Sequence, residues 1–268
     1  MTNKINGIAL VTGASTGIGA VYADRLARRG HDLILVARDA ARLEAVAKKL
    51  RAETGRTIEV VPADLTVRSD VAKLESRLAS DPAITVLVNN AGIALNGGLL
   101  ENGAAELQNL IAVNITAPTL LAAAAAKAFA ERKRGAIINI ASVLALAPEL
   151  LEASYSGSKA YLLNLSVKLA LDLKDKGVRV QAVLPGATRT EIWERSGKDI
   201  DALLPGMVMS VGDLVDAALV GFDKGEVVTI PPLANEQLWT AYNEARLALA
   251  PNLSRQEVAD RYRTAKAA

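Results

Sequence analysis

Tyr155 and Lys159 are four residues apart in a stretch that the sequence predicts to be helical, so their side chains share one helix face. A free tyrosine has a pKa of about 10 and is a poor acid or base at neutral pH. A neighbouring ammonium favours the phenolate and lowers that pKa. Tyr155 is therefore a candidate to exchange a proton with the oxygen of a carbonyl or alcohol. A tyrosine and a lysine at this spacing are also common as an exposed surface pair.

Two polar residues upstream could complete such a site. Ser142 follows a predicted strand and could hydrogen-bond a substrate oxygen and orient it. Asn114 lies inside a predicted long helix and could hold a water that connects Lys159 to solvent. Ser154 and Ser158 are alternatives to Ser142, and a serine after a strand is also a usual helix cap.

The sequence contains few of the residues that other kinds of catalytic centre need. The chain has one histidine, His31, and no cysteine. His31 falls in the predicted turn before the second strand, so we expect a structural role. A histidine-based triad, a zinc site and a thiol nucleophile are therefore disfavoured. The lack of cysteine also fits a reducing compartment.

A glycine-rich turn follows the first apolar run, with Gly13, Gly17 and Gly19 inside Thr12-Gly-Ala-Ser-Thr-Gly-Ile-Gly. A turn from strand to helix exposes backbone N–H groups that attract a pyrophosphate, and glycine lets the backbone approach it closely. The spacing differs from G-x-G-x-x-G, and a bare triplet is weak evidence, but the flanking strand and helix supply the context. We expect dinucleotide contacts from Gly13, Ser15, Thr16, Gly17, Ile18 and Gly19.

The residues after the second predicted strand bear on which dinucleotide binds. An acidic residue about 20 positions beyond the turn would hold a ribose 2′-OH, whereas an arginine there can pair with a 2′-phosphate. Arg38 stands at that place, so NADP(H) is favoured, and NAD(H) is possible through Asp39. Asp64 and Leu65, after the third strand, could read an adenine edge, or Asp64 could cap a helix.

Apolar runs of strand length alternate with amphipathic stretches along the chain. Strands are expected at 8–12, 33–37, 57–61, 84–89, 136–140, 178–183 and 226–230, and helices at about 18–29, 40–54, 69–80, 104–132 and 154–176. The strands are almost continuously apolar, which is typical of a parallel sheet covered on both faces. The repeated units predict an α/β, doubly wound fold.

No linker or composition break divides the chain, so we expect a single domain over 1–268. A substrate-loop insert at 190–212 contains Trp193, Met207 and Met209, and we favour it as a lid over the simpler alternative of a surface loop. A helical extension at 232–268 breaks near residues 251–254, with Ser254 as a plausible N-cap. This tail is equally compatible with a lid and with a packing or oligomer arm.

Charge and hydropathy limit the partners that the sequence predicts. Lys plus Arg number 31 and Asp plus Glu 29, which is too balanced to favour nucleic acid or an anionic membrane. The sequence shows no secretory signal, and the apolar run at 120–126 is far shorter than a bilayer span. We expect a cytoplasmic protein with a small-molecule substrate and with no nucleic acid or membrane partner.

Taken together, these motifs resemble those of the short-chain dehydrogenase/reductase family over about residues 5–232. The glycine turn is similar to the family's cofactor turn, and Asn89-Asn90-Ala91-Gly92 to its motif after the fourth strand. A later segment resembles the one that holds the nicotinamide carboxamide and the phosphates. It comprises Pro185, Gly186, Thr188 and Thr190.

The resemblance implies roles for particular residues. Asn114, Ser142, Tyr155 and Lys159 fall on the family's catalytic tetrad, with Tyr155 as general acid/base and Lys159 also binding the nicotinamide ribose. Asn90, Ala91 and Gly92 would touch the cofactor.

The resemblance also implies a seven-stranded sheet in the order 3-2-1-4-5-6-7 with helices on both faces, and hydride transfer to the B face of the nicotinamide. Ala37-Arg38 resembles the NADP(H)-preferring subgroup, although Thr16 stands where many NADP enzymes place a basic residue. The helices that carry Asn114 and Tyr155 often form a dimer contact in this family, which implies a homodimer or homotetramer.

The presumptive substrate pocket has apolar candidate walls, and no Arg or Lys is clearly placed to clamp a carboxylate, although Arg189 and Arg195 are near in sequence. The walls are Leu95, Val143, Leu144, Leu150, Ile192, Trp193, Met207 and Met209. A neutral, hydrophobic ketone or aldehyde is therefore expected.

Three hypotheses follow: an NADPH-dependent carbonyl reductase, an NAD-dependent alcohol dehydrogenase working in the oxidative direction, and a dinucleotide-binding sensor without turnover. The Tyr155–Lys159 pair disfavours the last, because a pure binder needs no proton donor.

Overall fold

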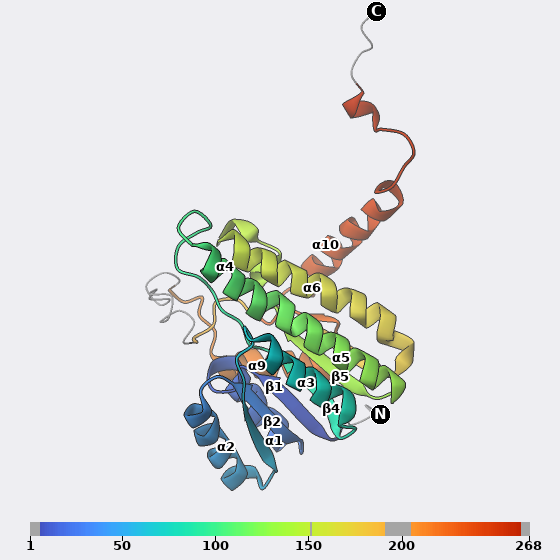
Figure 1. The fold of residues 1–268 in the computed structure, drawn as a ribbon. Helices are drawn as coiled ribbons and strands as arrows, with labels where there is room; N and C mark the ends of the chain where they lie inside the picture. The colour runs from blue at the N-terminus through green and yellow to red at the C-terminus, as the bar shows by residue number, and fades with distance from the viewer. Residues whose placement is uncertain (1–5, 151, 191–204, 264–268) are drawn as a thin grey trace, which may run out of the picture. The chain divides into compact units, whose positions relative to one another are not determined.

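The computed structural model describes residues 6–150, 152–190 and 205–263. Its centre is one sheet of seven parallel strands in the order β3-β2-β1-β4-β5-β6-β7 (Figure 1). The strands are β1 (Ile8–Thr12), β2 (Asp32–Ala37), β3 (Ile58–Pro62), β4 (Ile84–Asn89), β5 (Gly135–Ile140), β6 (Val178–Val183) and β7 (Val228–Thr229). The predicted fold class and strand order are confirmed.

Helices cover both faces of the sheet. One face carries α1 (Gly17–Arg28), α2 (Ala40–Thr54) and α9 (Val211–Lys224). The other carries α3 (Arg68–Ser80), α5 (Ala117–Glu131) and α6 (Ala153–Leu173), which lie side by side across the sheet in Figure 1. Side chains of a strand alternate between the two layers. In β2, for example, Leu33 and Leu35 face α1 and α2, and Ile34 and Val36 face α3.

The edge of the sheet at the carboxyl ends of β1 and β4 is the point that positions a ligand. β1 pairs with β2 on one side and with β4 on the other, so the chain reverses its direction of winding there. In open α/β sheets, ligands bind in the crevice outside such a switch point. The residues that follow β1, β2, β3 and β4 all reach this edge.

The predicted helix at 104–132 is interrupted. The structure has α4 (Ala104–Ile111), then one π-helical segment, η1 (Ala112–Thr116), and then α5. A π turn inserts an extra residue into the helix, a feature that commonly marks functional sites. Asn114 lies within η1.

Other predicted bounds change less. The last strand is only two residues long, and α9, which the sequence analysis did not predict, follows residue 210 with Ser210 as its N-cap. The helix of Tyr155 ends at Leu173 and continues as a 3₁₀ turn, η4 (Lys174–Lys176), before Gly177 at φ 67°. Gly177 adopts the left-handed conformation that ends many helices.

One helical stretch among the described residues, Ala104–Glu131, is long and apolar enough by composition to cross a membrane, with a mean hydropathy of 1.5. Half of that window is buried inside the protein. Ala117, Leu121, Ala125 and Phe129 of this stretch join the core between α3 and the sheet. Core helices satisfy the same composition test.

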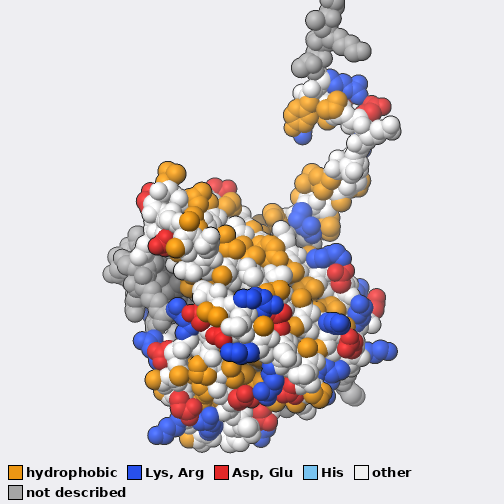
Figure 2. All heavy atoms as spheres, viewed as in Figure 1, with side chains coloured by type: hydrophobic (Ala, Val, Ile, Leu, Met, Phe, Trp, Pro, Cys, Tyr) orange, Lys and Arg blue, Asp and Glu red, His pale blue; other side chains and the backbone are white. Residues whose placement is uncertain are grey.

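The chain divides into two compact units, Met1–Pro232 and Leu233–Ala268. The second contains α10 (Glu236–Leu249) and two 3₁₀ turns, η5 (Ala250–Asn252) and η6 (Asp260–Tyr262). No residue of α10 is buried, and Figure 2 shows apolar side chains on its surface. No described helix starts at Ser254, so the predicted N-cap there is wrong. Asn235 caps α10 instead, by accepting from Gln237 N at 3.0 Å.

Candidate active site

The turn between β1 and α1 requires its glycines. Gly13 and Gly17 adopt φ values of 65° and 55°, which lie in the left-handed region that favours glycine. A Cβ on Gly19 would lie 2.2 Å from the main-chain oxygen of Gly13, closer than any contact allows. Thr16 is the N-cap of α1 and makes no side-chain capping bond, so the first N–H groups of α1 stay available to an anion.

The end of β4 holds this turn in place. Thr12 Oγ1 accepts hydrogen bonds from Asn90 N at 3.0 Å and from Ala91 N at 3.1 Å. In return, Asn90 Nδ2 donates to Thr12 O at 2.9 Å and to Gly13 O at 3.2 Å. The glycine turn and the Asn90-Ala91-Gly92 segment, far apart in sequence, therefore form one rigid rim.

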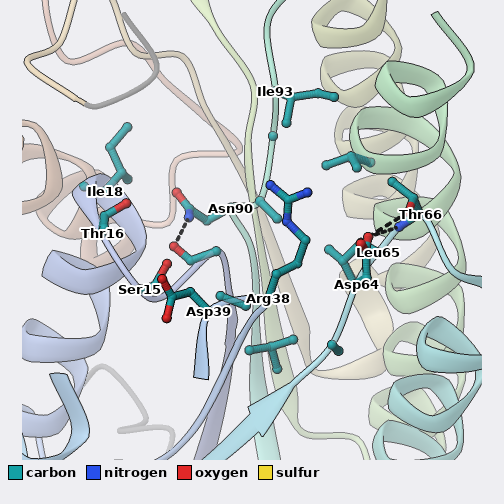
Figure 3. Close-up of a pocket in the computed structure, with 18 of the residues that line it drawn as sticks. Ser15, Thr16, Ile18, Arg38, Asp39, Asp64, Leu65, Thr66, Asn90 and Ile93 are labelled. Atoms are coloured by element: carbon teal, nitrogen blue, oxygen red, sulfur yellow. Dashed lines mark hydrogen bonds between the residues drawn. The ribbon is translucent and has the colours of Figure 1, made fainter. Parts of the chain in front are cut away.

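A cavity of about 1030 Å³ opens beside this rim (Figure 3). Most of the predicted cofactor residues line it: Gly13, Ser15, Thr16, Gly17, Ile18, Arg38, Asp64, Leu65, Asn90, Ala91, Gly92 and Thr190. The sequence analysis missed Arg42, Thr66, Ile93 and Asn109, which also line it. Six predicted cofactor residues do not line this cavity: Gly19, Tyr155, Lys159, Pro185, Gly186 and Thr188.

The two charged residues after β2 have different surroundings. Asp39 is the N-cap of α2: its Oδ1 accepts from Arg42 N at 3.0 Å, and its Oδ2 lies 3.5 Å from Arg42 Nε. Arg38 is exposed, lines the cavity and has no ion-pair partner among the described residues. In Figure 3 its guanidinium extends between Asn90 and the Asp64–Thr66 turn. A cation is thus available to a ligand, whereas the neighbouring carboxylate is engaged.

Asp64 stabilises its own turn. Its Oδ1 accepts from Thr66 N at 2.9 Å and from Thr66 Oγ1 at 2.7 Å. Leu65 is buried beside it, at 9% exposure. Asp64 is therefore held by local bonds with its carboxylate at the cavity wall, and it is not the N-cap of α3, which is Val67.

Lys159, on α6, lies close to the same cavity behind Gly92 but is not one of the residues that line it. Its ammonium is buried and donates to Ile140 O, at the end of β5, at 3.0 Å. A Cβ on Gly92, which lines the cavity, would lie 3.3 Å from Lys159 Nζ and 3.5 Å from Asn114 Oδ1. Burial lowers the pKa of Lys159 to about 8. Because Gly92 has no side chain, the ammonium can lie this close to the part of the cavity wall that Gly92 forms.

Tyr155 and Ser142 lie next to each other near this lysine. Burial raises the pKa of Tyr155 to about 12, and hydrogen bonding with Ser142 acts in the lowering direction. Ser142 is buried, and its Oγ also accepts from Leu144 N at 3.2 Å. The sequence analysis expected a lowered pKa for Tyr155 because of Lys159. That expectation is wrong here: Nζ lies 5.4 Å from the ring centroid and is bonded to Ile140 O, so burial of the tyrosine dominates.

The start of α6 fixes the orientation of Tyr155. Glu152 is the N-cap, and its carboxylate accepts from Ser154 N at 2.5 Å and Tyr155 N at 2.7 Å. One turn later, Ser158 Oγ donates to Tyr155 O at 2.7 Å. Ser158 therefore donates to the helix backbone. Ser142 is the serine whose hydrogen bonding lowers the pKa of Tyr155. Glu152, which the sequence analysis missed, was detectable as an acidic residue at the start of a predicted helix.

Asn114 connects the loop after β4 to α6. Its Oδ1 accepts from Ile93 N at 2.9 Å, and its Nδ2 donates to Ile93 O at 2.9 Å and to Ser158 Oγ at 3.1 Å. Both amide hydrogens are thus used by protein partners. The predicted role of Asn114 in holding a water stays a prediction.

The remaining predicted residues named here fall into four groups. His31 Nδ1 lies 3.0 Å from Gly7 O, away from the cavity, which agrees with a structural role. Leu150 and Met207 are about 70% exposed, so they do not form closed pocket walls in this state. Met209 bridges to Thr188 and fixes the segment before Thr190. Ile192, Trp193 and Arg195, and most of the predicted insert, lie outside the described residues.

Comparison with known proteins agrees with this geometry. Residues 7–201, more than half of the chain, match the family model for the short chain dehydrogenase. The chain belongs to the short-chain dehydrogenase family. Its similarity to solved family members extends further: a short-chain dehydrogenase from Sphingobium yanoikuyae in complex with NADPH is 52% identical, with a TM-score of 0.92 over 96% of this chain and 100% of that one.

Other family members are also similar. The bulky-bulky ketone specific alcohol dehydrogenase from Comamonas testosteroni is 47% identical, with a TM-score of 0.88 over 96% of this chain and 98% of that one. Human 17-beta-hydroxysteroid dehydrogenase type 3 is 37% identical over 186 residues, which is 68% of this chain and 59% of that protein. The match thus spans only about three fifths of the length of such curated short-chain dehydrogenases.

Proposed function

We propose that this protein is an NADP(H)-dependent oxidoreductase that interconverts a carbonyl and a secondary alcohol on a small, neutral, hydrophobic molecule. The observation that carries the proposal is the contact between two sites at Gly92. This residue lines the large cavity, and the Lys159 ammonium lies 3.3 Å from the position that a Cβ on Gly92 would occupy. The lysine beside the candidate proton donor Tyr155 and the large cavity therefore meet at one residue.

The residues present fit a dinucleotide. The cavity volume of about 1030 Å³ is at the upper end for ligand sites. The free N–H groups at the start of α1 and the side-chain-free glycines suit a pyrophosphate. Gly13, Ser15, Thr16, Gly17 and Ile18 would hold it, and Asn90, Ala91, Gly92 and Thr190 line the same cavity beside this turn.

When bound, the nicotinamide would supply or accept the hydride; the chain's own residues handle the proton. In the reductive direction, Tyr155 donates its phenolic proton to the substrate oxygen as negative charge develops there. Ser142 hydrogen-bonds the same oxygen and orients it. Lys159 provides a positive charge that favours the phenolate left behind and would bind the nicotinamide ribose. In the oxidative direction, the same proton moves from the alcohol to Tyr155.

The choice of NADP(H) follows from Arg38 and Asp39. A 2′-phosphate needs a cation, and Arg38 is exposed at the cavity without an ion-pair partner among the described residues. A ribose 2′-OH needs a free carboxylate, and Asp39 is engaged by Arg42 and by the start of α2. The Sphingobium yanoikuyae relative in complex with NADPH supports the same choice.

A hydrophobic carbonyl substrate is supported by two observations. The predicted walls beyond Ser142 are apolar, and Val143 packs on the core of α6 and β6. The Comamonas testosteroni relative is specific for ketones with bulky groups on both sides. We extend to this chain a preference for neutral ketones over charged ones. We also propose that the chain assembles as a homodimer or homotetramer.

The test has two stages. NADPH and NADH are first titrated into the purified protein, and cofactor fluorescence is followed. We expect NADPH to bind at least about tenfold more tightly, since a charge-assisted hydrogen bond contributes about 1.5–3 kcal/mol. Aryl ketones and a keto acid of matched size are then compared as substrates by the loss of NADPH absorbance at 340 nm.

Turnover of the ketones with NADPH supports the proposal. Tight NADH binding with oxidation of secondary alcohols would replace it by an NAD-dependent alcohol dehydrogenase. Tight cofactor binding without turnover of any carbonyl or alcohol would contradict the enzymatic role and favour a dinucleotide sensor.

A further inference from the structure

A chain of buried polar side chains runs beneath the active site and crosses from one helix to another. Asn89 Nδ2 donates to Pro118 O in α5 at 3.1 Å and to Asn139 Oδ1 at 2.9 Å. Asn139 Nδ2 donates to Ser166 Oγ in α6 at 2.9 Å, and Ser166 Oγ donates to Leu162 O at 2.7 Å. We call Asn89, Asn139 and Ser166 the sheet-to-α6 bridge.

Burial makes this bridge costly to break. Asn139 and Ser166 are 0% exposed and Asn89 is 3% exposed. A buried polar group that loses its partner retains the full cost of desolvation, about 1–3 kcal/mol. The bridge makes four hydrogen bonds, while the buried Asn89 Oδ1 has no partner among the described residues. The strand register places Asn89 directly opposite Asn139. The bridge is therefore a defined structural connection in an otherwise apolar layer.

Each member lies on the face of the sheet that carries α6. Asn139 alternates with Ile138 and shares the side of Ile137, and Asn89 shares the side of Leu87. On the helix, Ser166 follows Lys159 by seven residues, which is two turns, so the two side chains lie on one face. Adjacent residues of β5 therefore hold two points on that face that are two turns apart: Asn139 binds Ser166, and Ile140 O binds Lys159.

These two anchors differ in stiffness. The Lys159 ammonium sits at the end of a flexible four-carbon stem, so its bond to Ile140 O tolerates movement of the helix. Ser166 has a stem of one carbon, so Asn139 positions the helix backbone directly. The third anchor of α6, from Asn114 to Ser158, comes from η1 and not from the sheet.

We propose that Asn139 and Ser166 are positioning residues, which set the place of α6 along β5 so that Tyr155 and Lys159 meet the cavity in a reactive arrangement. They touch neither the cavity nor the reacting atoms. Misplacement of a catalytic group by about 1 Å can cost about a hundredfold in rate, so a small shift of α6 is enough to matter. This proposal rests on the proposed carbonyl reductase function.

The test compares two buried hydroxyls in full-length protein. Ser166→Ala removes the bridge, and Ser166→Thr restores its hydroxyl. The matched control is Thr229→Val, because Thr229 Oγ1 accepts from the buried Gln181 Nε2 at 2.8 Å in a polar contact between β6, β7 and α9. That contact is of the same kind but does not reach α6. Thermal melts establish that all variants fold.

We expect Ser166→Ala to lower kcat for NADPH-dependent ketone reduction about tenfold, with the ketone KM changed less than about twofold. Its Kd for NADPH, read by fluorescence, should rise about threefold because Lys159 shifts. Ser166→Thr should recover most of the kcat and most of the NADPH affinity. Thr229→Val should lower stability but change neither kcat nor the Kd for NADPH.

Two results would overturn the proposal: unchanged kcat and Kd in Ser166→Ala, or equal changes in Thr229→Val. The Kd comparison also separates the two proposals. If the wild-type protein binds NADPH but reduces no ketone, the proposed function fails, and the Kd values of Ser166→Ala and Thr229→Val still decide the role of the bridge.

Discussion

The ammonium of Lys159 lies 5.4 Å from the centroid of the Tyr155 ring. In this position it faces the aromatic ring, and its hydrogen bond goes to Ile140 O. Burial raises the pKa of Tyr155 above its ordinary value, so the tyrosine is protonated at neutral pH. The free protein is thus prepared to donate a proton, which is the form that carbonyl reduction requires.

Replacing Tyr155 by phenylalanine tests its role as the proton donor. We expect Tyr155→Phe to lower kcat about 10²–10⁴-fold, the usual contribution of a general acid or base. NADPH affinity should change little, because the variant keeps the ring. Stopped-flow measurement of ketone reduction and fluorescence titration provide the two values. A residual rate within tenfold of wild type would rule out Tyr155 as the donor.

Replacing Arg38 by aspartate tests the reader of the 2′-phosphate. Arg38→Asp removes a cation and introduces repulsion, so NADPH affinity should fall about 100-fold while NADH affinity holds or improves. Arg68→Asp is the control, because Arg68 is an exposed arginine that pairs with Glu75 and does not line the cavity. It makes the same change in net charge. If Arg38→Asp still bound NADPH more tightly than NADH by the wild-type ratio, the assignment of Arg38 to the 2′-phosphate would be contradicted.

Gly19→Ala tests the rim of the cavity, and Gly157→Ala, in α6, is its control. Gly19→Ala forces a Cβ against Gly13 O and Asn90 Nδ2, so we expect a loss of more than about 2 kcal/mol in the free energy of unfolding and a loss of NADPH binding. Gly157→Ala meets no atom within 4 Å in α6 and should stabilise the protein by about 0.5–1 kcal/mol. Urea denaturation measures both. Equal effects would show that the rim is not constrained.

The buried Lys159 should make stability depend on pH. Its pKa falls from 10.5 in the unfolded chain to about 8, so between those values the unfolded state binds more protons and the free energy of unfolding rises with pH. At pH 7 the lysine is charged in both states, and its burial costs stability.

Lys159→Met removes this cost. We expect the variant to be about 2 kcal/mol more stable at pH 7, after allowing for the lost bond to Ile140 O, with the difference shrinking from pH 8 to pH 9.5. Urea denaturation at three pH values measures it. Above pH 10 the raised pKa of Tyr155 acts in the opposite direction, so the range stops below that. A difference that is constant with pH would contradict a depressed pKa for Lys159.

Sequence patterns predicted most of the fold because the sheet is buried on both faces. β1 and β4 are almost continuous apolar runs, β6 is interrupted by Arg179 and Gln181, and the bounds of all three match the predicted ones. β7 differs because it pairs with β6 alone at the edge of the sheet, where apolar residues extend beyond the two that form the ladder. The π turn at Asn114 left no mark in the periodicity, since one inserted residue looks like ordinary variation in an alanine-rich helix.

The candidate site was predictable in its residues but not in its bonding. The structure brings Asn114, Ser142, Tyr155 and Lys159 near one another, and their catalytic roles stay predictions. The motifs did not show that burial outweighs the effect of Lys159 on the pKa of Tyr155, because burial depends on tertiary packing. The sheet-to-α6 bridge was also missed, although Asn139 in the apolar run of β5 was a signal that a buried partner was required.

The π turn also separates the rotational phase of α4 from that of α5. Each residue advances a helix by about 100° and 1.5 Å, so the extra residue in η1 lets Asn114 face Ile93 and Ser158 while α5 keeps its alanine face on the sheet. Deleting one residue from Ala112–Thr116 would restore a regular helix. It would also swing α4 through more than a quarter of a turn and carry Asn109 away from the cavity wall. One inserted residue thus lets this helical stretch both pack on the sheet and contribute to the site, which a continuous helix would not do.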